Sequence, residues 1–219
     1  MSLRSRVERL LRSPVSPLTR AGRARRRFNC ADQGAASWDE RARDAVRLWR
    51  ETRGTWVPEA RAELVVGDLG AGSERLRPAL VDGMPQPHRY LAYDLHPQLP
   101  STERLDVLSE MPDRHFDVVF CLGLLEYVPP GNSFPARLAS TCRFAVVSYV
   151  ATDLEPLTAE ERRERDWVSH YSREQLEALF EAEGFVRDAF TTTERGRSGV
   201  WLWSAPREPR ATSWEAAPR

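Results

Sequence analysis

The chain has 219 residues, and its 32 basic side chains, all arginines, balance 32 acidic ones. A hydrophobic content of 41% fits a globular protein, and no apolar run approaches the roughly 18 residues that a membrane-spanning helix needs. Cysteines 30, 121 and 142 match neither a zinc pattern nor a disulfide framework, which favours a reducing, cytoplasmic location. The lack of lysine and isoleucine, whose codons are A/T-rich, indicates a GC-rich bacterial source.

The overall charge balance conceals two unlike segments. Residues 1–27 contain nine arginines and a single acid, Glu8, so they carry a net charge of +8 and the remaining 192 residues carry −8. This predicts a basic N-terminal extension over residues 1–36, partly helical or disordered. It is interpreted as a solvated tail, as a weak contact with a membrane surface or an acidic partner, or as a nucleic-acid binder. Nucleic acid is not expected, because the rest of the chain is acidic and shows no recognition module.

The first firm helix is predicted to begin near Ser37, where Glu40 three residues later completes the pattern of a capping box. Apolar residues then repeat at helical spacing as far as Trp49, and Gly54 and Pro58 end the helix. Short apolar runs, typical of buried strands, alternate with helical patterns beyond this point. They predict strands at 64–67, 89–93, 104–107, 116–121 and 144–150, and helices at 73–81 and 132–140.

The last third of the chain has a different pattern. Ser172 and Gln175 predict the cap of a helix that ends at Gly184. Two strand-like runs follow, at 185–193 and 199–205, and predict a β-hairpin. Strands that alternate with helices indicate an α/β fold, in which helices cover both faces of a parallel sheet. Residues 206–219 are predicted to be a flexible polar tail.

The sharpest local signal is the run Asp68-Leu69-Gly70-Ala71-Gly72, where a buried strand enters a glycine turn and a helix follows. Glycines let the backbone approach a ligand closely, and the helix N-terminus supplies oriented N–H groups. A dinucleotide fingerprint would place its third glycine at Arg75, whose side chain would crowd a pyrophosphate. An NAD-dependent oxidoreductase is therefore disfavoured.

These residues resemble the first motif of the class I S-adenosylmethionine-dependent methyltransferases, which is an acid, any residue, and Gly-x-Gly. The family often has another glycine two positions later, where this chain has Glu74. Further acids match at the end of the second strand, with Asp94, and after the third, with Asp106. The run 116–128 resembles the fourth motif. The resemblance covers residues 37–205, which we expect to form the methyltransferase domain.

The resemblance implies a Rossmann-like, seven-stranded, mostly parallel sheet with a C-terminal antiparallel hairpin and helices on both faces. It also implies S-adenosylmethionine as cofactor and methyl transfer to a small-molecule acceptor, at oxygen rather than nitrogen. In the family, acids matching Asp68, Asp94 and Asp106 lie near the ammonium end, the ribose hydroxyls and the adenine amino group. The cofactor-binding residues implied are Asp68, Gly70, Ala71, Gly72, Asp94, Leu95, Asp106, Val107, Cys121 and Leu122.

Two side chains are candidates for a catalytic role. His170 lies in the loop that this family uses to cover the substrate, and a neutral imidazole takes up a proton near pH 7. Glu126 follows the fourth strand. Each also has a structural interpretation, a hydrogen bond for His170 and packing on the sheet for Glu126. Four aromatic residues either cover the cofactor or substrate or pack in the core: Trp38, Trp49, Trp167 and Tyr171.

No metal is expected. Some O-methyltransferases of the family hold a divalent ion with a Glu-x-x-Glu-His set, and this chain has Gly123, Glu126 and Tyr127 at those positions. An alternative function is that of a catalytically silent methyltransferase-like module, which contacts a partner or a membrane surface through its basic extension. The sequence leaves the acceptor and the oligomeric state open.

Overall fold

The structure, a computed structural model, describes residues 35–58 and 62–206. The predicted basic extension over residues 1–36 and the polar tail that follows residue 205 therefore lie almost wholly outside the described residues. Within the described part, no helix is long and apolar enough to cross a membrane.

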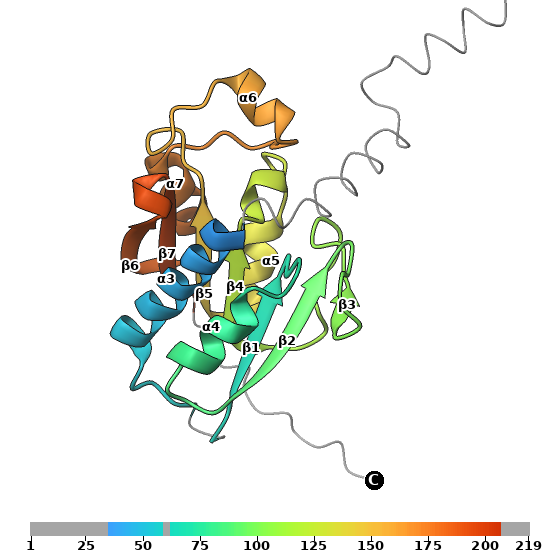
Figure 1. The fold of residues 1–219 in the computed structure, drawn as a ribbon, viewed down its shortest axis with the longest axis vertical. Helices are drawn as coiled ribbons and strands as arrows, with labels where there is room; N and C mark the ends of the chain where they lie inside the picture. The colour runs from blue at the N-terminus through green and yellow to red at the C-terminus, as the bar shows by residue number, and fades with distance from the viewer. Residues whose placement is uncertain (1–34, 59–61, 207–219) are drawn as a thin grey trace, which may run out of the picture. The chain divides into compact units, whose positions relative to one another are not determined.

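A single mixed sheet of seven strands forms the centre of the described domain (Figure 1). Its order is β3-β2-β1-β4-β5-β7-β6, and every neighbouring pair is parallel except β5 with β7 and β6 with β7. The predicted sheet, mostly parallel with a C-terminal antiparallel hairpin, is confirmed. The strands are β1 (Leu64–Leu69), β2 (His88–Asp94), β3 (Thr102–Arg104), β4 (Phe116–Leu122), β5 (Cys142–Tyr149), β6 (Val186–Thr193) and β7 (Ser198–Ser204).

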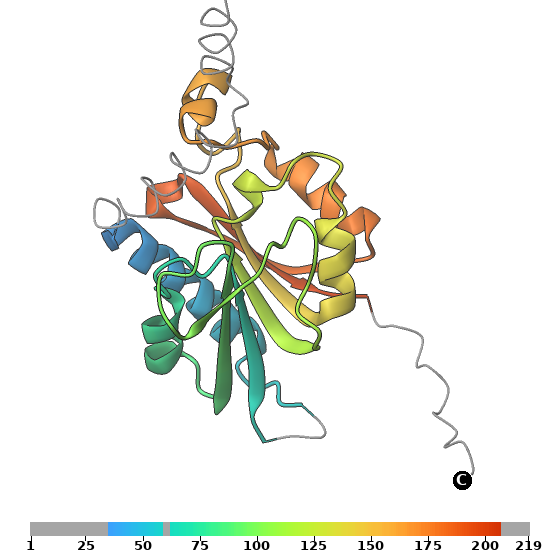
Figure 2. The same ribbon diagram turned by 90° about the vertical axis from the view of Figure 1, so that its right-hand side faces the viewer.

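Helices cover both faces of the sheet, as predicted. Helices α3 and α4 lie on one face, and α5 and α7 lie on the other (Figures 1 and 2). The described helices are α3 (Ala35–Arg53), α4 (Leu76–Gly83), α5 (Phe134–Thr141), α6 (Ala159–Glu164) and α7 (Arg173–Ala182), with short 3-10 helices η2 (Leu125–Tyr127) and η3 (Glu194–Gly196).

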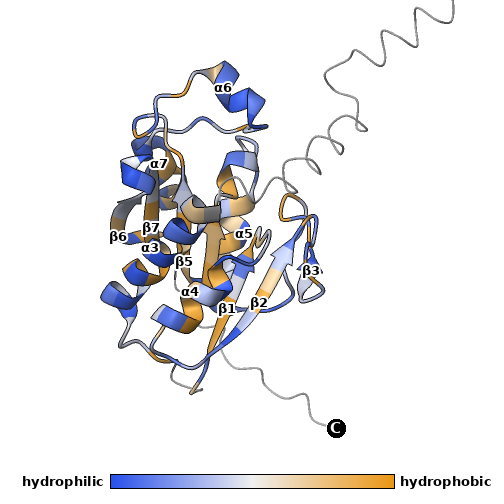
Figure 3. Cartoon of the chain, viewed as in Figure 1, coloured by the Kyte–Doolittle hydropathy of each residue, from blue (hydrophilic) through white to orange (hydrophobic). Residues whose placement is uncertain are grey.

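Two hydrophobic clusters explain why the sheet is covered on both faces. The apolar stripe that begins with Ala42 and ends with Trp49 is fully buried and packs α3 on the sheet, where Trp49 meets Phe144 edge-on. The other cluster buries Phe134 of α5 and Phe180 of α7. Figure 3 shows the central strands as the most hydrophobic part of the chain. Trp49 is therefore a core residue and does not cover a ligand.

Three details of the sequence prediction are corrected by the structure. Helix α3 begins at Ala35, so Ser37 lies within it, and the Ser37 hydroxyl donates to the Glu194 carboxylate instead of capping the helix. The third strand ends at Arg104, because the apolar side chains at 105 and 107 are buried in a loop and not in the sheet. Helix α6, which the apolar pattern does not predict, is polar along its length and begins at a Thr158–Glu161 capping box (Figure 3). The predicted Ser172–Gln175 box is confirmed.

The carboxyl ends of the parallel strands meet at one edge of the sheet. The glycine turn follows β1, η2 follows β4, and the segment that carries α6 follows β5, so all three lie at this edge (Figure 2). Ligands of open α/β sheets bind outside the carboxyl ends of the strands, at the point where the strand order reverses. In this sheet the reversal falls between β1 and β4.

Candidate functional site

The glycine turn after β1 has the backbone that its sequence predicts. Gly70 and Gly72 have φ angles of +77° and +52°, in the left-handed region that glycine favours. The N–H groups of Gly70 and Ala71 both donate to the carbonyl of Tyr93 on the adjacent strand, at 2.8 and 3.0 Å. A Cβ atom added to Gly72 would meet nothing within 4 Å. There is therefore open space at the turn, where a ligand can approach the backbone.

Asp94, at the end of β2, is joined directly to this turn. Its carboxylate accepts the N–H of Gly72 at 2.8 Å and the N–H of His96 at 2.7 Å. The side chain is buried. Because a carboxylate offers about four lone-pair positions, it still has capacity for ligand hydroxyls after accepting these two bonds. The backbone thus holds the Asp94 carboxylate in place at the edge of the turn.

Asp68, at the end of β1, is a buried carboxyl that accepts a 2.6 Å hydrogen bond from the Tyr90 hydroxyl. Its pKa is raised to about 7, mainly by burial; the bond from Tyr90 opposes this rise, and the negative charges of Asp94 and Glu74 contribute to it. Three acids therefore lie close enough to influence one another. Such a cluster attracts a cationic ligand, whose charge would in turn favour the ionised form of Asp68.

Glu74 occupies the position where the family often has a glycine, and its φ angle of +56° is in the left-handed region. Its carboxylate accepts bonds of 2.7 Å from the hydroxyls of Ser101 and Thr102 and forms an ion pair of 2.7 Å with Arg77. Burial alone would raise the pKa of Glu74, but these hydroxyls and Arg77 bring it below its ordinary value. The contacts hold a backbone conformation that costs a residue with a Cβ atom about 1–2 kcal/mol.

The other residues predicted for cofactor binding are spread around this edge. Asp106 is half-buried and accepts the N–H of Leu108 at 3.0 Å, and its loop starts beside Asp94, whose carbonyl accepts the N–H of Leu105. The remaining side chains differ in exposure: Ala71 and Val107 are buried, Leu122 is half-buried and Leu95 is exposed. Burial of Cys121 in the core raises the pKa of its thiol well above the ordinary value. The structure thus brings Asp68, Asp94 and the glycine turn together.

Helix α3 covers the end of β4. Gly123 has a φ angle of +68°, its N–H donates to the Ser148 hydroxyl at 2.9 Å, and a Cβ atom there would lie 2.4 Å from the indole of Trp38. The Arg41 guanidinium lies 4.4 Å from the centre of the Trp38 ring. Only a glycine fits beneath this aromatic and cationic pair.

Glu194 joins α3 to the loop of the C-terminal hairpin. Its carboxylate forms a 2.5 Å ion pair with Arg41 and accepts bonds from the hydroxyls of Ser37 and Ser198. Its backbone N–H donates to Glu40 at 3.1 Å. Burial would raise the pKa of Glu194, whereas Arg41 and the two hydroxyls bring it below the ordinary value. The predicted capping residues Ser37 and Glu40 thus hold the hairpin loop.

The two catalytic candidates have opposite environments. Glu126 is 1% exposed, and its Oε1 accepts the N–H of Val150 at 3.0 Å. Burial raises its pKa, and the positive charges of Arg41 and Arg162 oppose that effect. His170, in contrast, is exposed. Because its pKa is raised, the Glu126 carboxylate accepts a proton more readily near neutral pH than an ordinary carboxylate at the protein surface would.

The neighbour of His170 fixes this segment to the domain. Ser169 is fully buried, donates to the carbonyl of Leu125 at 2.7 Å, and shares a 3.1 Å hydrogen bond with the Tyr149 hydroxyl. The N–H groups of Val168 and Ser169 donate to the carbonyl of Glu126. This segment therefore packs directly on η2.

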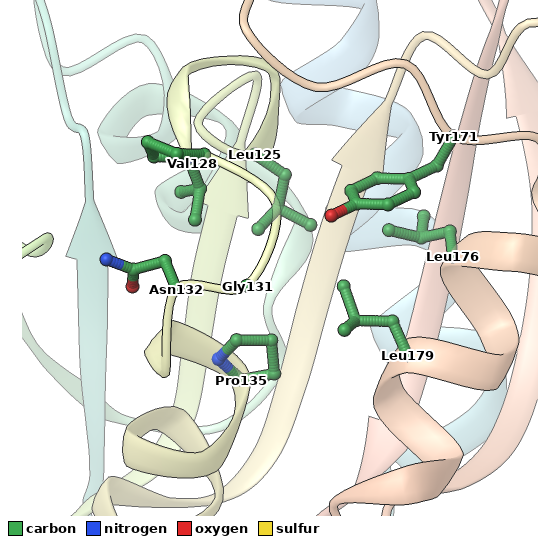
Figure 4. A pocket seen from close by; sticks show the side chains of 9 residues that line it. Leu125, Val128, Gly131, Asn132, Pro135, Tyr171, Leu176 and Leu179 are labelled. Atoms are coloured by element: carbon green, nitrogen blue, oxygen red, sulfur yellow. The ribbon is translucent and has the colours of Figure 1, made fainter.

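A separate pocket lies on the face of the sheet covered by α5 and α7. Its walls are mostly apolar, and the Tyr171 hydroxyl points into it (Figure 4). Tyr171 is one of the four aromatic residues singled out in the sequence, but none of the residues predicted for cofactor binding or catalysis lines the pocket. In the described part of the chain, no group of three His, Cys, Asp or Glu side chains is arranged to hold a metal ion.

Sequence reasoning did not identify Arg41 or Arg162 as members of this edge. Arg162 is 1% exposed although it belongs to a run of charged residues. Arg41 is also buried, although other arginines of α3, such as Arg43 and Arg47, are exposed. The only available signal was the Thr158–Glu161 capping box, which would have predicted α6 by the same rule as Ser172–Gln175.

The sequence matches no protein-family model and no curated protein, but solved structures similar to this fold include several methyltransferases. The magnesium protoporphyrin IX methyltransferase of Synechocystis, solved with bound S-adenosylhomocysteine, is 17% identical with a TM-score of 0.57 over 77% of this chain and 84% of its own. An O-methyltransferase family 2 protein of Planctomyces limnophilus in complex with apigenin is 14% identical, with a TM-score of 0.62 over 83% of this chain and 61% of its own.

The mitomycin 7-O-methyltransferase is 17% identical, with a TM-score of 0.60 over 84% of this chain and 58% of that protein. At these identities the likeness concerns the fold. The described domain has the fold of the class I S-adenosylmethionine-dependent methyltransferases, in agreement with the resemblance of its motifs.

Proposed function

We propose that this protein is an S-adenosylmethionine-dependent methyltransferase that acts on a small-molecule acceptor at oxygen, with residues 37–205 as its catalytic domain. The observation that carries the proposal is the Asp94 carboxylate, which the backbone of the glycine turn holds at the edge of the sheet where this fold binds its cofactor. The solved neighbours support the choice of oxygen, since one is a 7-O-methyltransferase and another is an O-methyltransferase family 2 protein.

The residues present fit this cofactor. Asp94 has lone pairs left for the ribose hydroxyls, and the open space at Gly72 admits a ligand against the backbone. The acids Asp68, Glu74 and Asp94 suit a ligand that carries a sulfonium and an ammonium group. Asp106, in the next loop, offers a carboxylate to the adenine amino group.

When bound, S-adenosylmethionine supplies a methyl group on a positively charged sulfur. The task of the protein is to align the acceptor with that methyl group and to exclude water. Helix α3, with Trp38 directly over Gly123, covers part of the end of β4. The acceptor hydroxyl gives up its proton to a nearby base. The candidate for this base is Glu126 in η2, which follows β4. His170, at the surface, is the weaker candidate.

Calorimetric titration with S-adenosylhomocysteine tests the proposal without knowledge of the acceptor. We expect one binding site per chain, and failure to bind at millimolar concentration would contradict the proposal. Transfer of a labelled methyl group to a panel of hydroxylated small molecules then tests turnover. Binding without transfer to any compound would favour the silent module over the enzyme.

A further inference from the structure

The carboxyl of Asp68 is almost completely buried and forms no ion pair with another described residue. Asp68 is 3% exposed, and the only hydrogen-bond donor to its side chain in the described part of the chain is the Tyr90 hydroxyl, 2.6 Å from Oδ2. The charges that act on it, those of Asp94 and Glu74, are both negative. Buried carboxylates in proteins are normally paired with a cation. Asp68 is therefore an exception that a cationic ligand would complete.

The groups that face Asp68 come from three neighbouring parts of the fold. Strand β2 contributes Tyr90 and Asp94. The turn before α4 contributes Glu74, and β4 contributes the thiol of Cys121. Burial raises the pKa of this thiol well above its ordinary value, so the thiol is neutral. The negative charge of an ionised Asp68 is thus not compensated by any of these groups.

Tyr90 reaches Asp68 because of the register between β1 and β2. Tyr90 lies opposite Val66, two residues before Asp68 on the adjacent strand. Residues two apart on a strand share a face, so the side chains of Tyr90 and Asp68 lie on the same face of the sheet. Tyr90 packs there against the hydrophobic cluster that α3 and α4 form with the sheet. The hydrogen bond therefore follows from the pairing of two strands and not from a loop.

Arg77 of α4 is a cation in this region, but it is engaged with other groups. Its guanidinium forms the 2.7 Å ion pair with Glu74 and lies 4.7 Å from the centre of the Tyr90 ring. Tyr90 thus contacts Arg77 with its ring and Asp68 with its hydroxyl. Burial and the negative charge of Asp68 raise the pKa of the Tyr90 hydroxyl, so this hydroxyl stays protonated and remains a donor.

We propose that Tyr90 is a positioning residue of the cofactor site, which holds Asp68 as the counter-ion of the cofactor's ammonium group and sets the pH above which the cofactor binds tightly. This rests on the proposed function. The hydroxyl donates to Oδ2 and leaves the lone pairs of Oδ1 for the ligand. An ammonium group favours the ionised carboxylate, so binding releases the proton that Asp68 holds in the free protein. That proton passes to solvent, and no other bond changes.

The direction of the pH dependence follows from the protonation of Asp68. Its pKa is raised to about 7, mainly by burial. Below this pH the carboxyl is mostly protonated, and a proton must leave when the ligand binds. The affinity should therefore fall about tenfold for each pH unit below 7 and should be nearly constant above it.

Calorimetric titration of the full chain with S-adenosylhomocysteine, between about pH 5.5 and 9, measures this dependence. Repetition near pH 6 in two buffers of different ionisation enthalpy counts the protons released. We expect an affinity about tenfold lower at pH 6 than at pH 8, and release of close to one proton per ligand at pH 6. The ligand control, 5′-methylthioadenosine, lacks the amino-acid part and should release no proton. No release with S-adenosylhomocysteine, or equal release with both ligands, would overturn the proposal.

Tyr90→Phe removes the bond to Oδ2 and keeps the ring against Arg77. Loss of this donor should move the midpoint of the pH dependence upward by about one pH unit. The affinity should then be roughly fivefold below that of the wild type at pH 7 and nearly equal to it at pH 9. A loss of the same size at every pH would reveal a merely structural role and overturn the proposal. Tyr171→Phe, which removes a hydroxyl in the separate pocket (Figure 4), is the matched control and should follow the wild-type curve.

Asp68→Asn keeps an acceptor for the Tyr90 hydroxyl and removes the titrating group. Its affinity for S-adenosylhomocysteine should be low and independent of pH. A pH dependence equal to that of the wild type would assign the titration to another group and overturn the proposal. If S-adenosylhomocysteine binds the wild type with one affinity at every pH, the role of Tyr90 and Asp68 is overturned and the proposed function stands. If it binds at no pH, the proposed function falls, and this inference falls with it.

Discussion

The two sides of this site differ in how far their polar groups are already paired. On the cofactor side, formed by Asp68, the glycine turn and Asp94, each carboxylate has a hydrogen-bond donor from the protein. On the side proposed for the acceptor, which includes Gly123 and Glu126, the buried Glu126 Oε2 has no hydrogen-bond partner among the described residues. The comparison teaches that the protein itself holds the carboxylates of the proposed cofactor side in place, whereas one carboxylate oxygen on the other side is not held.

The largest effect is expected where α3 covers the acceptor side. Arg41→Met should reduce the free energy of unfolding by about 3–5 kcal/mol, because it leaves the Glu194 carboxylate, whose side chain is only 13% exposed, without its cation. Arg197→Met removes an exposed ion pair with Glu155 and should cost less than about 1 kcal/mol. Urea denaturation of both variants measures the difference. Equal losses would show that α3 is not held by this charge pair.

A pH-dependent effect of similar size is expected on the cofactor side. The pKa of Asp68 is about 7 in the folded chain against 3.8 for the ordinary carboxyl, so the folded state keeps the proton that the unfolded state has lost. Wild-type stability should therefore fall as pH rises from 4 to 7, by up to about 4 kcal/mol.

Asp68→Asn removes this dependence while the Asn side chain still accepts the Tyr90 hydroxyl. The variant should match the wild type at pH 4, exceed its stability at pH 8, and bind S-adenosylhomocysteine more weakly. Parallel stability curves for the two proteins across this pH range would refute the raised pKa.

The preorganisation of the cofactor side is tested by Asp94→Ala. Loss of charge-assisted bonds to the ribose should weaken binding of S-adenosylhomocysteine by about 1.5–3 kcal/mol, or roughly 10- to 150-fold. Asp82→Ala, which removes an exposed acid on α4, is the control and should bind as the wild type does. Unchanged affinity in Asp94→Ala would show that Asp94 does not bind the ribose, which contradicts the proposed cofactor site.

The smallest effect concerns the left-handed backbone at Glu74. Glu74→Ala and Glu74→Gly both lose the bonds to Ser101, Thr102 and Arg77, but only glycine is free of strain at a φ of +56°. The glycine variant should therefore be more stable than the alanine variant by about 1 kcal/mol in thermal or urea unfolding. The reverse order, which is usual in a helix, would contradict this backbone conformation.

The backbone of the proposed cofactor side was predictable from the sequence, because it is set locally in the chain. The glycine turn and the strand ends at Asp68 and Asp94 are set by short patterns that require particular backbone angles. The parallel strands of the sheet and the C-terminal hairpin likewise followed from the apolar runs, whereas the order of the strands did not. Glu74 shows the limit of a motif, since tertiary contacts with Ser101 and Thr102 replace the glycine that the family often has.

The acceptor side was not predictable in the same way. Arg162 lies in a run of charged residues over 160–166, and only the tertiary fold buries it rather than its neighbours. Ser37 and Glu40 fit a capping box by spacing, but their real partner, Glu194, lies more than 150 residues later in the chain. Contacts of this kind depend on packing between distant segments, which no local pattern contains.

A crystal structure of the complex with S-adenosylhomocysteine tests the central claim most directly. The account predicts that the ribose hydroxyls lie within hydrogen-bond distance of the Asp94 carboxylate and that Gly72 and its turn keep their present backbone. It also predicts that the sulfur points toward Gly123 and Glu126. A ligand bound elsewhere, or a turn that must refold to admit it, would contradict a preorganised cofactor site.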